Sequence, residues 1–213
     1  LTSRLGVKFV EGLQGDGPVM KTAACAKHFA VHSGPEAIRH EFDAKATMKD
    51  MWETYLPAFE ALVTEADVES VMGAYNRTNG EPCCGHHYLM EEVLRGKWKF
   101  DGHFVSDCWA IKDFHENHKI TKNARESAAL ALKRGCDVNC GNTYLHLLGA
   151  VEDGLITEED ITRSAERALT ARYLLGLFEG SEYDKIPYEK VECKEHIEEA
   201  LNVARKGCVL LKN

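Results

Sequence analysis

The sequence predicts an α/β fold, the later half of a (β/α)8 TIM-like barrel with helices outside a parallel sheet. Short apolar runs alternate with helix-length amphipathic segments, a pattern that indicates right-handed crossovers and parallel strands. Polar residues end these runs, at the edge where parallel barrels build active sites. An open doubly wound sheet is the alternative, but no G-x-G-x-x-G follows a run and no G-x-x-x-x-G-K-[ST] occurs.

The apolar runs have the length of β-strands. We expect strands over residues 22–29, 69–76, 102–107 and 136–140. Their carboxyl ends carry the polar residues Lys27, His28, Tyr75, Asn76, Asp107 and Asp137. Because the carboxyl ends of parallel strands meet at one edge of a sheet, these side chains are expected to converge.

Helical periodicity predicts helices over residues 47–66, 86–96, 122–134, 143–152 and 157–175. Thr47-x-x-Asp50 and Thr157-x-x-Asp160 have the spacing of a capping box. Pro57 predicts a kink inside the first helix. Gly135 and Gly176 mark helix ends.

Three parts are expected along the 213 residues. Residues 1–178 form the barrel part, residues 179–193 a polar linker, and residues 194–213 the start of a further domain. This last part has a helix over residues 194–206 and a strand that begins at residues 209–213. The chain starts at Leu1 rather than Met and stops within a strand, so we expect a fragment of a longer protein.

Composition excludes several classes of partner. The net charge is −8, from 34 acidic residues against 26 Lys and Arg, which argues against a nucleic-acid or anionic-membrane surface. No run of about eighteen apolar residues is present, so no membrane-spanning helix is expected. The eight cysteines are expected to be mostly small buried hydrophobic residues, because the chain is too large to need a disulfide scaffold.

Two segments are dense in metal-ligand types but have the wrong spacing. Cys83-Cys84-Gly85-His86-His87 lacks the C-x2-C and H-x3-H pairs that surround a tetrahedral zinc. His115-Glu116-Asn117-His118 places its histidines at i and i+3, whereas zinc proteases use i and i+4. No metal and no cofactor are predicted.

The candidate chemistry centres on Asp107. It ends the predicted strand Phe104-Val105-Ser106-Asp107, so its carboxylate would emerge from a buried strand at the barrel mouth. An ionised carboxylate there can attack the anomeric carbon of a sugar, although a helix cap or a structural ion pair is an equal alternative. Lys27 and His28 could hydrogen-bond hydroxyls and keep a nearby carboxylate ionised, or be a surface lysine beside a structural histidine. Arg39 lies in a predicted loop, where the ordinary expectation is an exposed ion pair.

Several motifs together resemble the N-terminal barrel domain of glycoside hydrolase family 3, the β-glucosidase and β-xylosidase family. The similarity extends over nearly the whole chain. The matching stretches are Lys27-His28-Phe29 with Gly34-Pro35-Glu36 and Arg39, residues 53–59, residues 71–76 with Asn79-Gly80, residues 98–102, Val105-Ser106-Asp107-Cys108, residues 135–141 and residues 209–213.

The resemblance implies roles at the matching positions. Asp107 would be the catalytic nucleophile, and Lys27, His28 and Arg39 would hold the sugar hydroxyls. Met72 and Tyr75 would line the same subsite, with Tyr75 close to the nucleophile. Trp109 follows two positions after Asp107, and its ring is either a platform for the sugar or part of the packing.

The implied activity is that of a retaining, exo-acting β-glycosidase that removes terminal β-D-xylosyl or β-D-glucosyl residues from an oligosaccharide or aryl β-glycoside. Cys108, where many β-glucosidases of the family have Trp, favours the xylosidase type. Cys108 and Cys140 are expected to lie within bonding reach and to narrow the pocket where a C6 hydroxymethyl group would sit. They form either a disulfide or two neighbouring thiols, and the thiol form suits a cytoplasmic enzyme, the location favoured here.

Two departures from the family pattern bear on activity. The general acid/base, usually a Glu on a following α/β sandwich domain, is not identifiable, so the missing C-terminal domain of the same chain is an expected partner. The upstream sugar-binding Asp and Arg would precede Leu1. A half-barrel has unpaired sheet edges, so we expect the 213 residues alone to be inactive and prone to aggregate. A non-catalytic carbohydrate-binding relic and a metalloprotein are the alternative functions.

Overall fold

A computed structural model describes residues 1–212 of the chain, and Asn213 lies outside the described residues. The chain divides into two compact units, Leu1–Phe178 and Glu179–Asn213. The assignment of residues 179–193 as a linker and of residues 194–213 to a further domain stays a prediction.

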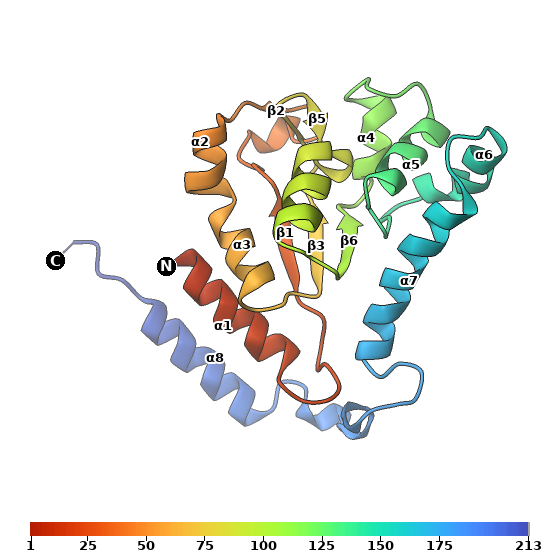
Figure 1. Cartoon of the computed structure of the whole chain (residues 1–213). Helices are drawn as coiled ribbons and strands as arrows, with labels where there is room; N and C mark the ends of the chain where they lie inside the picture. The colour runs from red at the N-terminus through yellow and green to blue at the C-terminus, as the bar shows by residue number, and fades with distance from the viewer. Residues whose placement is uncertain (213) are drawn as a thin grey trace. The chain divides into compact units, whose positions relative to one another are not determined.

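The main sheet of the first unit has three strands in the order β1-β3-β6, and both pairings are parallel: β1 (Cys25–Phe29), β3 (Ser70–Gly73) and β6 (His103–Ser106). Figure 1 shows the strands side by side in the middle of this unit, with helices around them. The predicted α/β class, with helices outside a parallel sheet, is confirmed. The fourth strand, predicted over residues 136–140, is reduced to one parallel bridge between Val105 and Val138.

A second, smaller sheet joins the segments that follow β1 and β3, and the sequence did not predict it. It consists of β2 (Asp43–Ala44), β4 (Arg77–Thr78) and β5 (Glu81–Pro82). The β2–β4 pair is parallel and the β4–β5 pair is antiparallel. This sheet ties together the segments that carry Arg39 and Tyr75.

Helices account for most of the remaining first unit. They are α1 (Thr2–Gln14), η1 (Glu36–Ile38), α2 (Met48–Asp50), η2 (Met51–Tyr55), α3 (Pro57–Thr64), η3 (Cys83–Gly85), η4 (His87–Lys97), α4 (Ala110–Glu116), α5 (Ala124–Lys133), η5 (Thr143–His146), α6 (Leu147–Glu152) and α7 (Glu158–Leu174). Both predicted capping boxes are confirmed, because Thr47 accepts from the Asp50 amide and Thr157 from the Asp160 amide. The helix predicted over residues 47–66 is interrupted at Leu56, next to Pro57.

Two helices escaped prediction because their starts lack sequence signals. The N-terminus of α1 has no side-chain cap, and the helix contains Gly6 and Gly12. The start of α4 follows Trp109, which adopts a left-handed conformation with φ of 68° and also provides no side-chain cap. Neither start therefore carries the residues that usually mark a helix N-terminus.

The two faces of the main sheet differ sharply in burial. Side chains toward the helices are buried, with Ala26 at 4% exposure and Val71 and Phe104 at 0%. On β1, the alternate residues Cys25 and Lys27 are exposed. Because successive strand residues face opposite sides of a sheet, Lys27 belongs to the open face and the core lies behind it.

The described part of the second unit, residues 179–212, contains two 3-10 turns and one helix: η6 (Glu182–Lys185), η7 (Tyr188–Lys190) and α8 (Lys194–Gly207). The helix predicted over residues 194–206 is therefore confirmed. The strand predicted over residues 209–213 is wrong for residues 209–212, which form no regular structure, and Asn213 lies outside the described residues.

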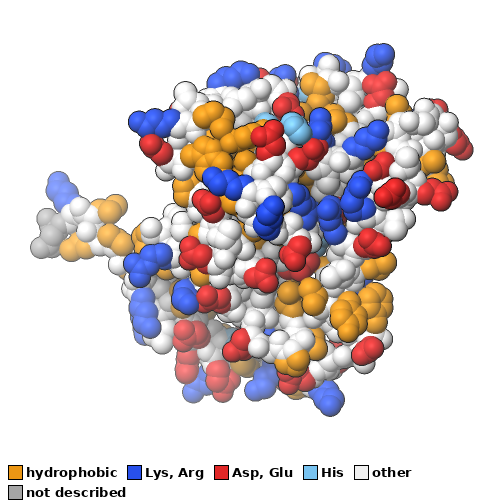
Figure 2. Space-filling view, viewed as in Figure 1, with side chains coloured by type: hydrophobic (Ala, Val, Ile, Leu, Met, Phe, Trp, Pro, Cys, Tyr) orange, Lys and Arg blue, Asp and Glu red, His pale blue; other side chains and the backbone are white. Residues whose placement is uncertain are grey.

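Charged side chains of both signs are interspersed on the face drawn in Figure 2, and hydrophobic side chains form separate patches. Basic residues do not dominate this face, in agreement with the acidic net charge of −8. Within residues 1–212, no helix combines the length and the apolar character needed to cross a membrane.

Candidate active site

The sheet brings Asp107 and His28 together from distant parts of the sequence. Asp107 directly follows β6, and His28 lies near the end of β1, with β3 between these two strands. The His28 Nε2 atom lies 3.3 Å from Asp107 Oδ2. The Asp107 side chain is 13% exposed, so its carboxylate is largely shielded but still accessible at the open face.

An irregularity in β1 explains how two consecutive residues reach the same edge. Ala26 pairs with Val71 and Phe29 with Gly73, so Lys27 and His28 stand opposite Met72 alone. One extra residue on a strand turns a side chain that would otherwise point to the other face. The Lys27–His28 and Phe29–Ala30 peptide bonds are both cis. His28 is half-buried beside Asp107, and the change of register between Ala26 and Phe29 accounts for this position.

Opposing effects act on the His28 imidazole. Burial lowers its pKa, the negative charge of Asp107 raises it, and the positive charge of Lys27 lowers it, with a net lowering. A neutral imidazole beside Asp107 is suited to donating hydrogen bonds to sugar hydroxyls, and the exposed Lys27 side chain carries a further donor. One oxygen of Asp107, Oδ1, accepts from the backbone amide of Cys108 at 2.8 Å.

Tyr75 is the hydroxyl donor of the site. It follows β3, and burial together with the charge of Asp107 and a hydrogen bond to Asp107 raises its pKa to about 12. The phenol therefore stays protonated at neutral pH and donates to Asp107. The Arg39 guanidinium carbon lies 5.0 Å from the centre of the Tyr75 ring, and Met72 is half-buried on β3.

Arg39 is held by neighbours that the sequence analysis did not single out. Its Nη1 atom forms an ion pair with Glu36, as expected for an arginine in this exposed loop. Its Nε atom also donates to His40 Nε2 at 3.3 Å, and His40 Nδ1 lies 2.7 Å from Asp113 Oδ2. Asp113 is buried in the structure, but its sequence context Ala110-Ile111-Lys112-Asp113-Phe114 gives no signal that could have indicated this cluster.

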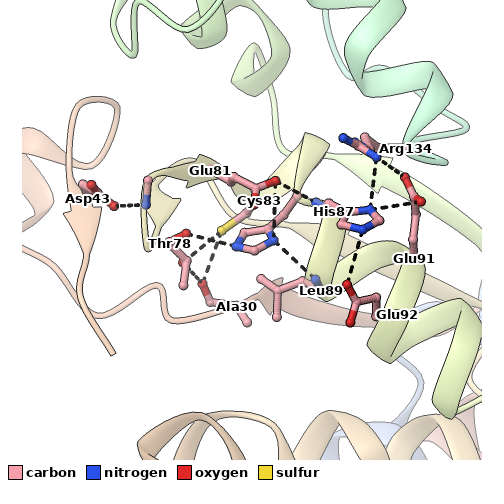
Figure 3. A network of polar contacts seen from close by, with 12 residues as sticks. Ala30, Asp43, Thr78, Glu81, Cys83, His87, Leu89, Glu91, Glu92 and Arg134 are labelled. Carbon is pink, nitrogen blue, oxygen red and sulfur yellow. Dashed lines mark hydrogen bonds and ion pairs between the residues drawn. The ribbon is translucent and has the colours of Figure 1, made fainter. Parts of the chain in front are cut away.

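A buried polar network fixes the loop that follows β1. Figure 3 shows Thr78 and Cys83 directed at Ala30, where the Thr78 hydroxyl donates to the Ala30 carbonyl at 3.0 Å and the Cys83 thiol donates at 3.3 Å. The Asn76 amide donates to the Val31 carbonyl at 3.3 Å. Asn76 is fully buried, so this polar residue after β3 supports the loop and is not exposed at the site edge.

The cysteine- and histidine-rich segment has structural contacts. His86 caps η4, because its Nδ1 accepts from the Leu89 amide at 3.3 Å. His87 lies between Glu91, Glu92 and Arg134 (Figure 3). Among residues 1–212 no group of three or more His, Cys, Asp or Glu is arranged to hold a metal ion.

Cys108 and Cys140 are neighbouring thiols, and all eight cysteines of the chain are free. A hydrogen bond with Cys108 is the main cause that raises the pKa of the Cys140 thiol to about 11. The backbone also joins the two segments, because the Trp109 amide donates to the Cys140 carbonyl at 2.7 Å. Trp109 itself is 50% exposed.

Asp137 does not belong to the site, contrary to its predicted place at a strand's carboxyl end. Its side chain is 0% exposed and forms ion pairs with Arg95 at 2.9 Å and Arg167 at 3.0 Å. It also accepts from the Phe104 amide at 2.9 Å, at the amino end of β6. Asp137 therefore anchors the sheet to η4 and α7.

The fold and the site together define an α/β-barrel domain with a carboxylate at the carboxyl edge of its parallel sheet. Residues 1–171 match the glycosyl hydrolase family 3 N terminal domain. The chain belongs to glycosyl hydrolase family 3, and the resemblance inferred from its motifs is confirmed.

Curated relatives include β-xylosidases. A xylan 1,4-beta-xylosidase of Xylanibacter ruminicola is 43% identical over 100% of this chain and 26% of the relative. A probable exo-1,4-beta-xylosidase of Aspergillus clavatus is 40% identical over 99% of this chain and 29% of the relative. The chain thus spans between 26% and 29% of the length of these two relatives.

Solved structures of the family have the same fold. A GH3 exo-beta-xylosidase in complex with a xylobiose aziridine activity-based probe has a TM-score of 0.94 and 31% identity, covering 99% of this chain and 29% of that chain. A beta-glucosidase from Listeria innocua in complex with isofagomine has a TM-score of 0.89 and 31% identity, covering 99% of this chain and 31% of that chain.

Proposed function

We propose that this chain carries the nucleophile and part of the sugar-binding subsite of a retaining, exo-acting β-glycosidase. The observation that carries the proposal is the position of Asp107, which lies 3.3 Å from His28 and accepts a hydrogen bond from Tyr75. A carboxylate flanked by hydrogen-bond donors at the edge of the sheet is the arrangement that a nucleophile of this kind requires. Membership of glycosyl hydrolase family 3 supports the same chemistry.

In the proposed reaction, an oxygen of Asp107 attacks the anomeric carbon of a terminal β-linked sugar. The bond from this carbon to the aglycone oxygen breaks as the carboxylate ester forms, and a general acid protonates the leaving oxygen. Water then attacks the anomeric carbon, and the same group, now acting as a base, takes a proton from the water. Asp107 leaves as a carboxylate, and the sugar keeps its β configuration.

The proposed substrate-binding residues surround this carboxylate. Lys27 and His28 donate to sugar hydroxyls from β1, and Arg39 does so from the loop that follows. Tyr75 and Met72 line the subsite from β3 and its carboxyl end, and the exposed ring of Trp109 offers an apolar face to the sugar.

We place terminal β-D-xylosyl residues ahead of β-D-glucosyl residues as substrates. The two relatives described above are named as β-xylosidases. Cys108 follows the nucleophile directly and lies beside Cys140, and the backbone hydrogen bond between Trp109 and Cys140 holds these segments close. In the proposal this pair narrows the space that a C6 hydroxymethyl group would need, and xylose lacks that group.

The general acid/base lies outside this chain in the proposal. No carboxyl group other than Asp107 contacts the His28 and Tyr75 side chains among the hydrogen bonds and ion pairs of residues 1–212. We expect the general acid/base on a C-terminal domain of the same protein.

The test uses the full-length protein that contains this chain. Hydrolysis of p-nitrophenyl β-xyloside and p-nitrophenyl β-glucoside is measured, and proton NMR follows the configuration of the first sugar released. The proposal predicts a higher kcat/KM for the xyloside, the β anomer as first product, and loss of at least about a thousandfold in kcat for Asp107→Asn. Activity of that variant near the wild-type level, or α-xylose as first product, would contradict the proposal.

A further inference from the structure

A buried carboxylate and a histidine lie behind Arg39 and Tyr75. We propose that His40 and Asp113 are positioning residues that orient the Arg39 guanidinium and the Tyr75 ring for the sugar. The inference rests on the proposed function, because it gives His40 and Asp113 a role through two residues of the proposed subsite. Neither residue touches Asp107 in the contacts of residues 1–212.

Asp113 fixes the tautomer of His40. The Asp113 side chain is 6% exposed, and its Oδ2 atom lies 2.7 Å from His40 Nδ1. Its other oxygen accepts from the Asn117 amide at 2.5 Å. Burial raises the pKa of Asp113, while the hydrogen bond from His40 acts in the opposite direction. A carboxylate only accepts hydrogen bonds, so His40 Nδ1 must carry the proton that it donates.

The opposite ring nitrogen of His40 then orients Arg39. With the proton on Nδ1, a neutral imidazole has a lone pair on Nε2, and Arg39 Nε donates to this atom at 3.3 Å. Arg39 Nη1 is paired with Glu36. Two edges of the guanidinium are thus held from the protein side, and Nη2 has no hydrogen-bond partner among the contacts of residues 1–212. This nitrogen is the one left to bind a sugar hydroxyl.

His40 also packs on Tyr75. The two ring centres lie 4.4 Å apart with an angle of 57° between the rings, and the Arg39 guanidinium carbon lies 5.0 Å from the centre of the Tyr75 ring. Asp113 belongs to α4, which begins three residues after Asp107, whereas His40 and Tyr75 follow β1 and β3. One chain of contacts therefore connects the segments after β1, β3 and β6.

A positioning role and a purely structural role predict different kinetics. If His40 acts through Arg39, its replacement costs activity only where Arg39 contributes to binding of the sugar. If His40 only supports the fold, its replacement lowers activity equally with every substrate and adds to the effect of an Arg39 variant. A double-mutant cycle separates these cases, because coupled residues have non-additive effects.

The experiment measures kcat/KM for p-nitrophenyl β-xyloside and its 2-, 3- and 4-deoxy analogues with the full-length protein. The variants are His40→Phe, Arg39→Ala and the double variant. Phe keeps a ring against Tyr75 but makes neither polar contact. We expect His40→Phe to lose about tenfold or more on the parent substrate, and less than about threefold when Arg39 is already Ala. The deoxy substrate that abolishes the Arg39→Ala effect should also abolish the His40→Phe effect.

A conservative variant provides the rescue and an independent check on folding. Gln at position 40 keeps an acceptor near the place of Nε2, so His40→Gln should retain more activity than His40→Phe. If His40→Phe does not fold, His40→Gln replaces it in the double-mutant cycle with Arg39→Ala. Additive losses, or equal losses on all deoxy substrates, would overturn the positioning role while the wild-type protein still hydrolyses the parent xyloside. A wild-type protein without activity on any aryl glycoside would overturn the proposed function and this inference with it.

Discussion

Stability at mildly acidic pH should depend on His118, a buried histidine in the loop after α4. It is 5% exposed, and neither ring nitrogen has a hydrogen-bond partner within residues 1–212. Burial, and then the positive charge of Arg77, lowers its pKa from 6.5 to about 4. At a pH between the folded and the unfolded pKa values, the imidazole is neutral in the folded protein and becomes protonated only when the protein unfolds. The stability that it lends is therefore lost as the pH falls from 6.5 towards about 4.

The size of the effect follows from the two pKa values. A shift from 6.5 to about 4 corresponds to roughly 3 kcal/mol once both states are protonated, at about 1.4 kcal/mol for each pH unit. At about pH 5 the loss is roughly 2 kcal/mol, because the unfolded imidazole is already charged and the folded one is still neutral. His118→Phe removes this titration and keeps a ring stacked on Phe114, whose centre lies 6.3 Å from that of His118.

The assay is urea denaturation of the full-length protein at about pH 8 and about pH 5. Between about pH 8 and about pH 5, the free energy of the first unfolding transition should fall by about 2 kcal/mol more in wild-type protein than in His118→Phe. The matched control is His146→Phe at an exposed histidine, which should keep the wild-type pH dependence. Equal pH dependence in wild-type protein and His118→Phe would refute the argument that this buried imidazole is neutral in the folded state.

Three further predictions test the fold. Asp137→Asn leaves the charges of its two arginine partners without a counter-ion. Urea denaturation should therefore show a free energy of unfolding that is about 3–5 kcal/mol lower than in wild-type protein. Gly102→Ala would place a Cβ 2.0 Å from the Glu69 carbonyl and should lower the unfolding temperature, whereas Gly12→Ala, with no atom within 4 Å of the new Cβ, should not. The 213-residue chain expressed alone should aggregate and not hydrolyse p-nitrophenyl β-xyloside, and near-normal activity would contradict this expectation.

The parts of the fold that could be predicted are those with local signals. Apolar runs that alternate with amphipathic segments indicated the parallel sheet, and Thr157 with Asp160 marked the start of α7 because a capping box is a short-range contact. The start of α4 could not be predicted, since the chain turns there through Trp109 in a left-handed conformation that a non-glycine residue rarely adopts. The fourth strand was predicted too long because strand length depends on pairing across the sheet, which the residues themselves do not specify.

The same distinction applies to the site. The proximity of Asp107 and His28 could be predicted because polar residues at the ends of apolar runs converge in a parallel sheet. His40 could not, because its contacts with Asp113 join residues 73 positions apart and arise only from the packing of α4. Asp137 carried the same sequence signal as Asp107, yet its two buried ion pairs make it structural. A carboxylate beside an apolar run is therefore ambiguous until its partners are known.

The most direct test of the account is covalent trapping of Asp107. The full-length protein is incubated with 2-deoxy-2-fluoro-β-D-xylosyl fluoride, digested, and examined by mass spectrometry. We expect one added 2-fluoroxylosyl group on the peptide that contains Asp107, and no label in Asp107→Asn. Absence of label, together with retained binding of xylose, would indicate a carbohydrate-binding relic, and a label on another carboxylate would contradict the assignment of Asp107 as the nucleophile.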